Sequence, residues 1–265
     1  MTSHTAGTTD AAPTTAHRGA ASPARRVAAQ TAFETRMILR NGEQLLVTIF
    51  LPLFLLVALD RVHAIELDTG GASRIDFVTP GVLAVAVMST AFTSQAIATA
   101  FDRRNGVLRL MATTPLGRGG LLAGKFLGVL AVEVVQAVVL VAAALLLGWH
   151  PHAAGIPLAV LAGLLGTAAF TSLAMLVAGT LRAEGVLAVA NLLLVVLIAA
   201  GGVLVPPSHL APGWGHVAAL LPSGALGDAM RGALLDGSVP LGAVAVLLGW
   251  TVVLGWAARR WFRWQ

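Results

Sequence analysis

The stretch GGLLAGKFLGVLAVEVVQAVVLVAAALLL, residues 119–147, is the longest apolar run in this sequence. Only Lys125 and Glu133 within it are charged. An α-helix rises about 1.5 Å per residue and the hydrocarbon core of a bilayer is about 30 Å thick, so about 20 apolar residues are enough to cross it. The run therefore predicts a membrane-spanning helix.

The composition of the whole chain points the same way. Of its 265 residues, 57% are hydrophobic and 11% are charged, and the mean hydropathy is +0.84. A soluble domain has about 25% charged residues, and a core of this size could not hide so much apolar surface from water. These values exclude an ordinary soluble enzyme. The absence of cysteine from the sequence excludes disulfides, thiolate metal sites and cysteine nucleophiles.

Five further apolar runs are long enough to be considered as spans. We predict an all-α integral membrane protein in which residues 44–265 form one six-span domain. Pro52 lies within the first span and predicts a kink there. The predicted spans are residues 44–59, 77–100, 119–147, 156–180, 186–205 and 239–258.

The basic residues predict the orientation, because cytoplasmic loops carry an excess of Lys and Arg. With the N-terminus in the cytoplasm, only Arg61, Arg74 and Arg231 of the 17 basic residues fall outside. Six spans then return the C-terminus to the cytoplasm. The high isoelectric point, near 11.4, is explained by this topology and does not call for a nucleic-acid partner.

The first 43 residues differ from the rest. Residues 1–23 are rich in Thr, Ala, Ser and Gly and predict a disordered cytoplasmic tail. Residues 24–43 alternate arginines with apolar residues, and Phe33 and Met37 share one helix face. This pattern predicts an amphipathic helix at the membrane interface, with a solvated basic helix as the alternative.

One apparent nucleotide motif is better explained as helix packing. Gly119, four residues, Gly124 and Lys125 imitate a phosphate-binding loop, but Phe126 replaces the required Ser or Thr. Gly120, Gly124 and Gly128 instead form a ladder of small residues that would let another helix approach closely. We therefore expect no ATPase site, no catalytic residue and no metal site in this chain.

The segment FDRRNGVLRLMATTPL, residues 101–116, is the longest loop that the topology places in the cytoplasm. Val107, Leu108, Leu110 and Met111 put an apolar stripe on a short helix, which Thr113-Thr114-Pro115 ends. Such a helix can dock into the groove of another protein or lie on the lipid surface, and the residues alone leave both open.

These features together resemble the type-2 ABC permeases, the membrane subunits of drug, lipid and polysaccharide exporters. The resemblance runs from about Arg25 onward, and it is greatest to the daunorubicin-resistance-type permeases of actinobacteria. Leu221-Pro222-Ser223-Gly224 departs from the Asn-Pro-Leu-Thr-Tyr-type pattern of that family. The matching motifs are Leu39-Arg40-Asn41 with Gln44, Asp102 to Arg104, Gly106-Val107-Leu108, Thr114-Pro115-Leu116, Gly124-Lys125, and Pro206-Pro207 followed by Pro212-Gly213-Trp214.

The resemblance implies a mechanism. Two permease chains, identical or different, would pair in a bacterial cell membrane with two copies of a separate ABC ATPase, which binds the ATP and magnesium. Residues 24–43 would be a connecting helix, and 206–236 would form short re-entrant helices. A hydrophobic drug or lipid-like substrate would be exported. The residues implied to couple the loop to the ATPase are Asp102, Arg103, Arg104, Gly106, Val107, Leu108, Leu110 and Met111.

Polar residues inside the predicted spans are the remaining candidates. A carboxylate within a bilayer is costly, so Glu133 should face a partner or a cavity. Gln136 lies three residues on, on the same face. We predict that both line the substrate path or the dimer seam, where Glu133 would attract a cationic drug. Gln95 and Asn191 are further candidates, although hydrogen bonds between helices explain them equally well.

Three other functions are alternatives to an ATPase-driven permease. A self-sufficient secondary transporter would show internal repeats and paired broken helices, and no convincing similarity between the two halves is found. An intramembrane enzyme would need clustered His, Asp or Glu in the spans, where only Glu133 qualifies. A membrane scaffold that transports nothing stays open at this point.

Overall fold

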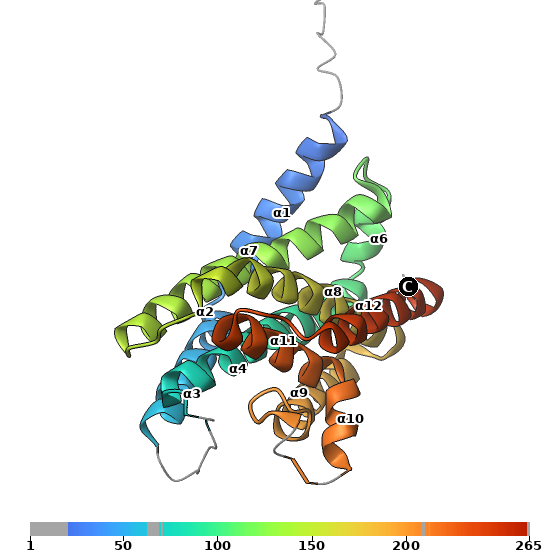
Figure 1. Ribbon diagram of the computed structural model, residues 1–265. Coiled ribbons are helices and arrows are strands. Elements are labelled where there is room, and N and C mark those ends of the chain that lie inside the picture. The colour runs from blue at the N-terminus through green and yellow to red at the C-terminus, as the bar shows by residue number, and fades with distance from the viewer. Residues whose placement is uncertain (1–20, 63–68, 70, 208–209, 212, 264–265) are drawn as a thin grey trace, which may run out of the picture.

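The computed structural model describes residues 21–62, 69, 71–207, 210–211 and 213–263, so the predicted tail at 1–23 lies almost wholly outside the described residues. All the regular elements among the described residues are helices (Figure 1). In chain order they are α1 (Pro23–Arg40), α2 (Gly42–Leu45), the π-helical η1 (Leu46–Phe50), α3 (Leu51–Arg61), α4 (Arg74–Met88), the π-helical η2 (Ser89–Ser94), α5 (Gln95–Arg104), α6 (Val107–Ala112), α7 (Gly117–Leu146), the 3₁₀ helix η3 (Ala153–Gly155), α8 (Ile156–Thr180), α9 (Ala183–Ala200), α10 (Trp214–Leu220), α11 (Pro222–Asp236) and α12 (Leu241–Trp261).

Five helical segments of the described chain are long and apolar enough to cross a membrane. They overlap the second to sixth predicted spans and are Arg74–Arg104, Gly117–Leu146, Ala153–Thr180, Ala183–Ala200 and Leu241–Trp261. The first predicted span, 44–59, is not one of them. Its residues form α2, η1 and α3 end to end, so a sixth span stays a prediction.

The segment Arg74–Arg104 is the centre of the structure. It joins α4, η2 and α5 into one continuous helical stretch, and 83% of its most apolar window is buried inside the protein. It packs against α3, α7, α8, α9 and α11. Most of the polar groups discussed below lie on this segment or on the helices that cover it.

The glycine ladder predicted in the third span is confirmed, and the helix that approaches it is α1. Figure 1 shows α1 beside the first half of α7. A Cβ atom built on Gly124 would lie 2.8 Å from the Cβ of Gln30, and one on Gly128 would lie 2.8 Å from the Cβ of Glu34. The missing side chains therefore allow close packing of the two helices. The phosphate-loop-like spacing lies within the continuous helix α7.

The connections gather at two opposite ends of the bundle. At the end that carries α6, called here the α6 end, Arg26 of α1 donates a hydrogen bond of 2.7 Å to the carbonyl of Pro115. There also the backbone N–H of Arg263, just after α12, donates to the carbonyl of Gly179 at 3.2 Å. At the other end the backbone N–H of His150 donates to Asp76. The start of α1 and the end of α12 thus lie on the same side.

The segment predicted to be re-entrant, 206–236, contains α10 and α11. Helix α11 is mostly buried against α4, α8 and α12. Its Arg231, which the charge count placed outside, is buried and donates to the carbonyls of Gly202 and Val203 as well as to Asp228. The guanidinium thereby donates to carbonyls that follow the end of α9 and receive no hydrogen bond from a helical N–H of the described chain. Re-entry into a membrane stays a prediction.

Gly155 of η3 lies directly against the backbone of α11. A Cβ atom at this position would lie 1.7 Å from the carbonyl oxygen of Ala233. We expect Gly155→Ala to lower the free energy of unfolding by about 2 kcal/mol, because the backbone of α11 must shift. Thermal unfolding in detergent measures this. Gly249→Ala, on α12 where nothing lies within 4 Å, is the control, and equal loss in both variants would contradict the prediction.

Candidate functional site

The loop between α5 and α7 forms a corner that displays α6. Gly106 begins this corner with φ of +74°, a left-handed conformation that glycine adopts without strain. The predicted apolar stripe is divided between two directions. Leu108 is 2% exposed and holds α6 against the protein, whereas Leu110 is 66% exposed, with Val107 and Met111 between these extremes. Helix α6 is therefore anchored by one side and open on the other.

The charged residues before α6 attach this corner to the connection between α8 and α9. The guanidinium of Arg103 donates to the carbonyl of Leu181, and Arg104 forms an exposed ion pair of 2.5 Å with Glu184. The two corners enclose a hollow of about 580 Å³, called here the basic hollow. It is lined by Arg103, Arg104, Asn105, Gly106, Arg109, Arg182, Ala183 and Glu184.

A buried ion pair network lies directly behind this corner. Lys125 of α7 is 2% exposed, and its Nζ lies 2.7 Å from Oδ2 of Asp102 and 3.1 Å from Oε1 of Glu34. Gln30 also donates to Oε1 of Glu34, at 2.8 Å. One ammonium group thus joins α1, the end of α5 and α7, and we call Lys125, Glu34 and Asp102 the Lys125 cluster.

The sequence prediction included Asp102 but missed the roles of Lys125 and Glu34. The available signal was a lysine inside an apolar run, since a buried ammonium group requires an opposite charge. Sequence spacing could not identify the acidic residue that pairs with Lys125, because Glu34 precedes it by 91 residues.

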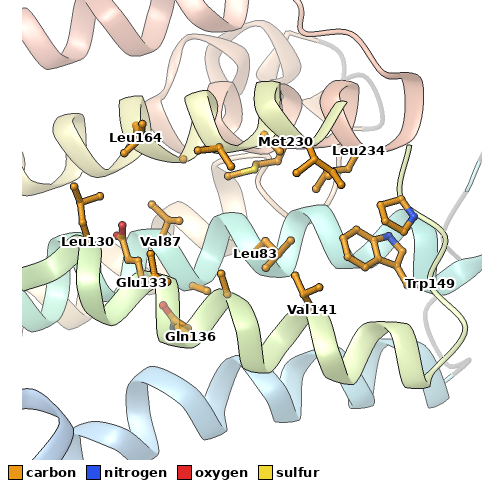
Figure 2. A pocket seen from close by; sticks show the side chains of 18 of the residues that line it. Leu83, Val87, Leu130, Glu133, Gln136, Val141, Trp149, Leu164, Met230 and Leu234 are labelled. Atoms are coloured by element: carbon orange, nitrogen blue, oxygen red, sulfur yellow. The ribbon is translucent and has the colours of Figure 1, made fainter. Parts of the chain in front are cut away.

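A cavity of about 390 Å³ lies between α4, α7, α8 and α11 (Figure 2). Glu133 lies toward one end of it and Trp149 at the other. Apart from these groups and Gln136, its wall is almost entirely apolar. Its principal side chains are Leu83, Val87, Leu130, Val134, Val141, Ile156, Ala159, Val160, Leu164, Met230 and Leu234.

Glu133 faces this cavity, which is one of the two surroundings that its cost in a bilayer predicts, a partner or a cavity. Its Oε2 lies 2.6 Å from the hydroxyl of Thr167, and its Oε1 has no hydrogen-bond partner within the described part of the chain. The same hydroxyl lies 2.8 Å from the carbonyl of Gly163. A hydroxyl donates one proton, so both contacts are hydrogen bonds when the carboxyl group is protonated and donates to Thr167.

Gln136 borders the cavity, but its amide group is used elsewhere. Figure 2 shows it pointing away from Glu133, toward the blue helical segment. Its Nε2 donates to the carbonyl of Thr48 in η1, and its Oε1 accepts a 3.0 Å hydrogen bond from Thr90 in η2. In an α-helix the carbonyl of Thr48 would pair with the N–H of residue 52, which Pro52 lacks. Gln136 therefore supplies the missing donor.

The other two polar candidates do not meet Glu133. Gln95 is buried in α5, and its amide donates to Thr99 of the same helix at 3.2 Å. Asn191 lies on the exposed side of α9 and donates to the carbonyl of Leu187 at 2.9 Å. Neither lines the cavity, and both bonds are within one helix, so of these four candidates Glu133 and Gln136 border the cavity and only Glu133 faces it.

Comparison with protein families matches residues 26–235 to the ABC-2 type transporter family. A search of curated proteins finds no match to this chain. The matched part runs from α1 into α11, and includes α6, the Lys125 cluster and the cavity. It covers well over half of the sequence. The chain therefore belongs to the ABC-2 type transporter family, and is a multi-pass membrane protein that serves as a permease subunit of an ABC transporter.

Proposed function

We propose that this permease exports a hydrophobic drug or lipid-like molecule from a bacterial cell, driven by ATP hydrolysis on a separate ABC ATPase that docks on α6. The observation that carries the proposal is the geometry of the α6 end. Helix α6 is fixed to the bundle through Leu108 and presents Leu110 outward. A short helix with one exposed apolar residue fits a groove on a second protein.

The charges around α6 indicate the chemistry of the docking groove. The basic hollow beside it contains four arginines and one acidic residue, Glu184. Complementary charge steers partners together and fixes their register. We therefore expect acidic residues on the ATPase surface that receives α6.

The Lys125 cluster is the proposed route from the docking surface to the spans. Asp102 is close to α6 in the chain, and Lys125 connects it to α7 and, through Glu34, to α1. A displacement of α6 would thus move α1 and α7 together. In this proposal α1 is the connecting helix, and the rocking of two paired permease chains opens the substrate path outward.

The topology proposed for this mechanism has the α6 end in the cytoplasm and residues 44–59 as the sixth span. The positive-inside rule places two loops in the cytoplasm, residues 101–116 and 181–185. The contact between Arg103 and Leu181 joins these loops at the α6 end. The similarity to daunorubicin-resistance-type permeases, together with Glu133, favours a cationic drug as the cargo.

Leu110→Asp tests the docking surface. We expect the variant to insert normally but to lose at least tenfold in ATPase co-purification and in substrate-stimulated ATP hydrolysis, because a carboxylate replaces the apolar residue that enters the groove. Leu241→Asp is the control, since Leu241 is also exposed, 86% against 66% for Leu110, but begins α12 at the other end. Undiminished coupling in Leu110→Asp, or export in cells that lack the ATPase, would contradict the proposed function.

A further inference from the structure

The cavity beside Glu133 holds two of the four buried polar side-chain atoms that have no hydrogen-bond partner among the described residues. One is Oε1 of Glu133, an acceptor, and the other is Nε1 of Trp149, a donor. A buried polar group without a partner costs about 1–3 kcal/mol. Two such groups in the wall of one cavity are explained together if a ligand bonds to both.

The two unpartnered groups lie far apart along the cavity. Figure 2 shows Glu133 near one end and Trp149 at the other. From Glu133 to the end of α7 at Leu146 the helix rises about 20 Å. A volume of about 390 Å³ extended over that length suits a slender molecule better than a compact one.

The cavity opens sideways between two candidate spans. Its wall includes Val134 of α7, which is 63% exposed, and Val160 of α8, which is 58% exposed. Ile156, Leu145 and Leu164 also line it and are exposed. Exposed apolar side chains on membrane-crossing helices face hydrocarbon, so a ligand would enter from the bilayer.

We propose that this cavity is a lateral binding site for a slender lipophilic amine that carries a hydrogen-bond acceptor at its far end. The amine nitrogen bonds to Glu133, the apolar body lies along α7 and α8, and the acceptor takes the N–H of Trp149. The inference rests on the proposed function in one respect, since it names the class of substrate.

The hydrogen bonds of Glu133 explain the preference for an amine. A neutral amine that arrives from the lipid takes the proton of the Glu133 carboxyl group, and the resulting ammonium donates to Oε1, the unpartnered oxygen. The hydroxyl of Thr167 then turns its proton from the carbonyl of Gly163 to Oε2, at the distance of 2.6 Å already present. Charge-assisted hydrogen bonds of this kind are roughly twice as strong as neutral ones. A fatty acid has no basic nitrogen to accept the proton of Glu133 and would place a second carboxyl group beside the first.

The test uses the purified permease in phosphatidylcholine nanodiscs, without ATPase or nucleotide. The probe is tritiated 12-methoxydodecylamine, with dodecylamine and 12-methoxydodecanoic acid as competitors. We expect saturable binding that is absent from empty nanodiscs. Dodecylamine should compete more weakly than the methoxy amine, because it lacks the acceptor for Trp149, and the acid should not compete.

Three variants and one control locate the site. Glu133→Gln should weaken binding at least tenfold, and Trp149→Phe should abolish the preference for the methoxy amine over dodecylamine. Ala159→Leu fills the cavity and should remove binding. Leu161→Phe, on α8 but outside the cavity wall, should bind as the wild type does.

The inference is overturned if the wild type shows no saturable binding, if the acid competes as well as the amine, or if well-folded Glu133→Gln and Ala159→Leu proteins both bind normally. A cavity occupied only by phospholipid chains would give the first of these results. None of these results tests the coupling to the ATPase, which the Leu110→Asp variant tests separately. Failure of this inference and failure of the proposed function are therefore distinguishable.

Discussion

Lys125→Met is expected to lower the free energy of unfolding by about 3 kcal/mol. The change removes the only ammonium group of the Lys125 cluster and leaves two carboxylates, of Glu34 and Asp102, close together and poorly hydrated. Removal of one partner from a buried ion pair costs about 3–5 kcal/mol. Glu34 and Asp102 remain 12% and 25% exposed, so we expect the lower end of that range.

A thermal unfolding curve of the detergent-solubilised protein measures this loss. The triple variant Lys125→Met, Glu34→Gln, Asp102→Asn should recover a large part of it, because no uncompensated charge is left. Arg25→Met, an exposed change on α1, should have an effect within about 0.5 kcal/mol. If the triple variant is less stable than Lys125→Met alone, the account of the cluster is wrong.

Gln136→Leu is expected to cost about 2–4 kcal/mol and to loosen the segment formed by η1 and α3. The substitution leaves the carbonyl of Thr48 without its donor and the hydroxyl of Thr90 without its acceptor. Each buried group left unpaired costs about 1–3 kcal/mol. These hydrogen bonds join η1 and η2 to α7, so we expect η1 to separate from η2 and α7.

A single cysteine reports this separation, because the natural sequence has none. Thr48→Cys introduces a buried thiol, whose labelling by a maleimide should be slow in the parent and at least tenfold faster with Gln136→Leu. Gln95→Leu is the matched control, since this buried glutamine bonds to Thr99 of its own helix. Equal labelling rates in the two backgrounds would show that Gln136 does not hold the segment.

Hydropathy predicts the parts of this fold that lipid determines. Residues 119–147 were predicted as one span, and α7 covers Gly117–Leu146, because a run this apolar has no alternative to a helix in a bilayer. Periodicity within one helix also predicted the ladder of Gly120, Gly124 and Gly128, as the close approach of α1 confirms. Both predictions depend only on neighbours in sequence.

The contacts of the candidate site depend on how helices are rotated against one another, which spacing does not reveal. Spacing places Leu108 and Leu110 on one stripe, yet the rotation of a six-residue helix depends on tertiary packing, and of these two only Leu108 is buried. The same limit explains why Gln136, on the face of Glu133 by spacing, bonds to η1 and η2 instead. The coupling and substrate roles of these residues stay predictions.

The burial of α11 has a consequence for how this protein is made. Asp228 and Arg231 each oppose insertion into hydrocarbon, by about 2.5–3.5 kcal/mol at the middle of a bilayer. Their ion pair and the carbonyls of Gly202 and Val203 offset that cost, but those carbonyls exist as acceptors only after α9 has ended. Of the helices that pack against α11, α4 and α8 leave the ribosome before it and α12 leaves after it. We therefore expect α11 to be added to helices already in place and to be covered by α12 last.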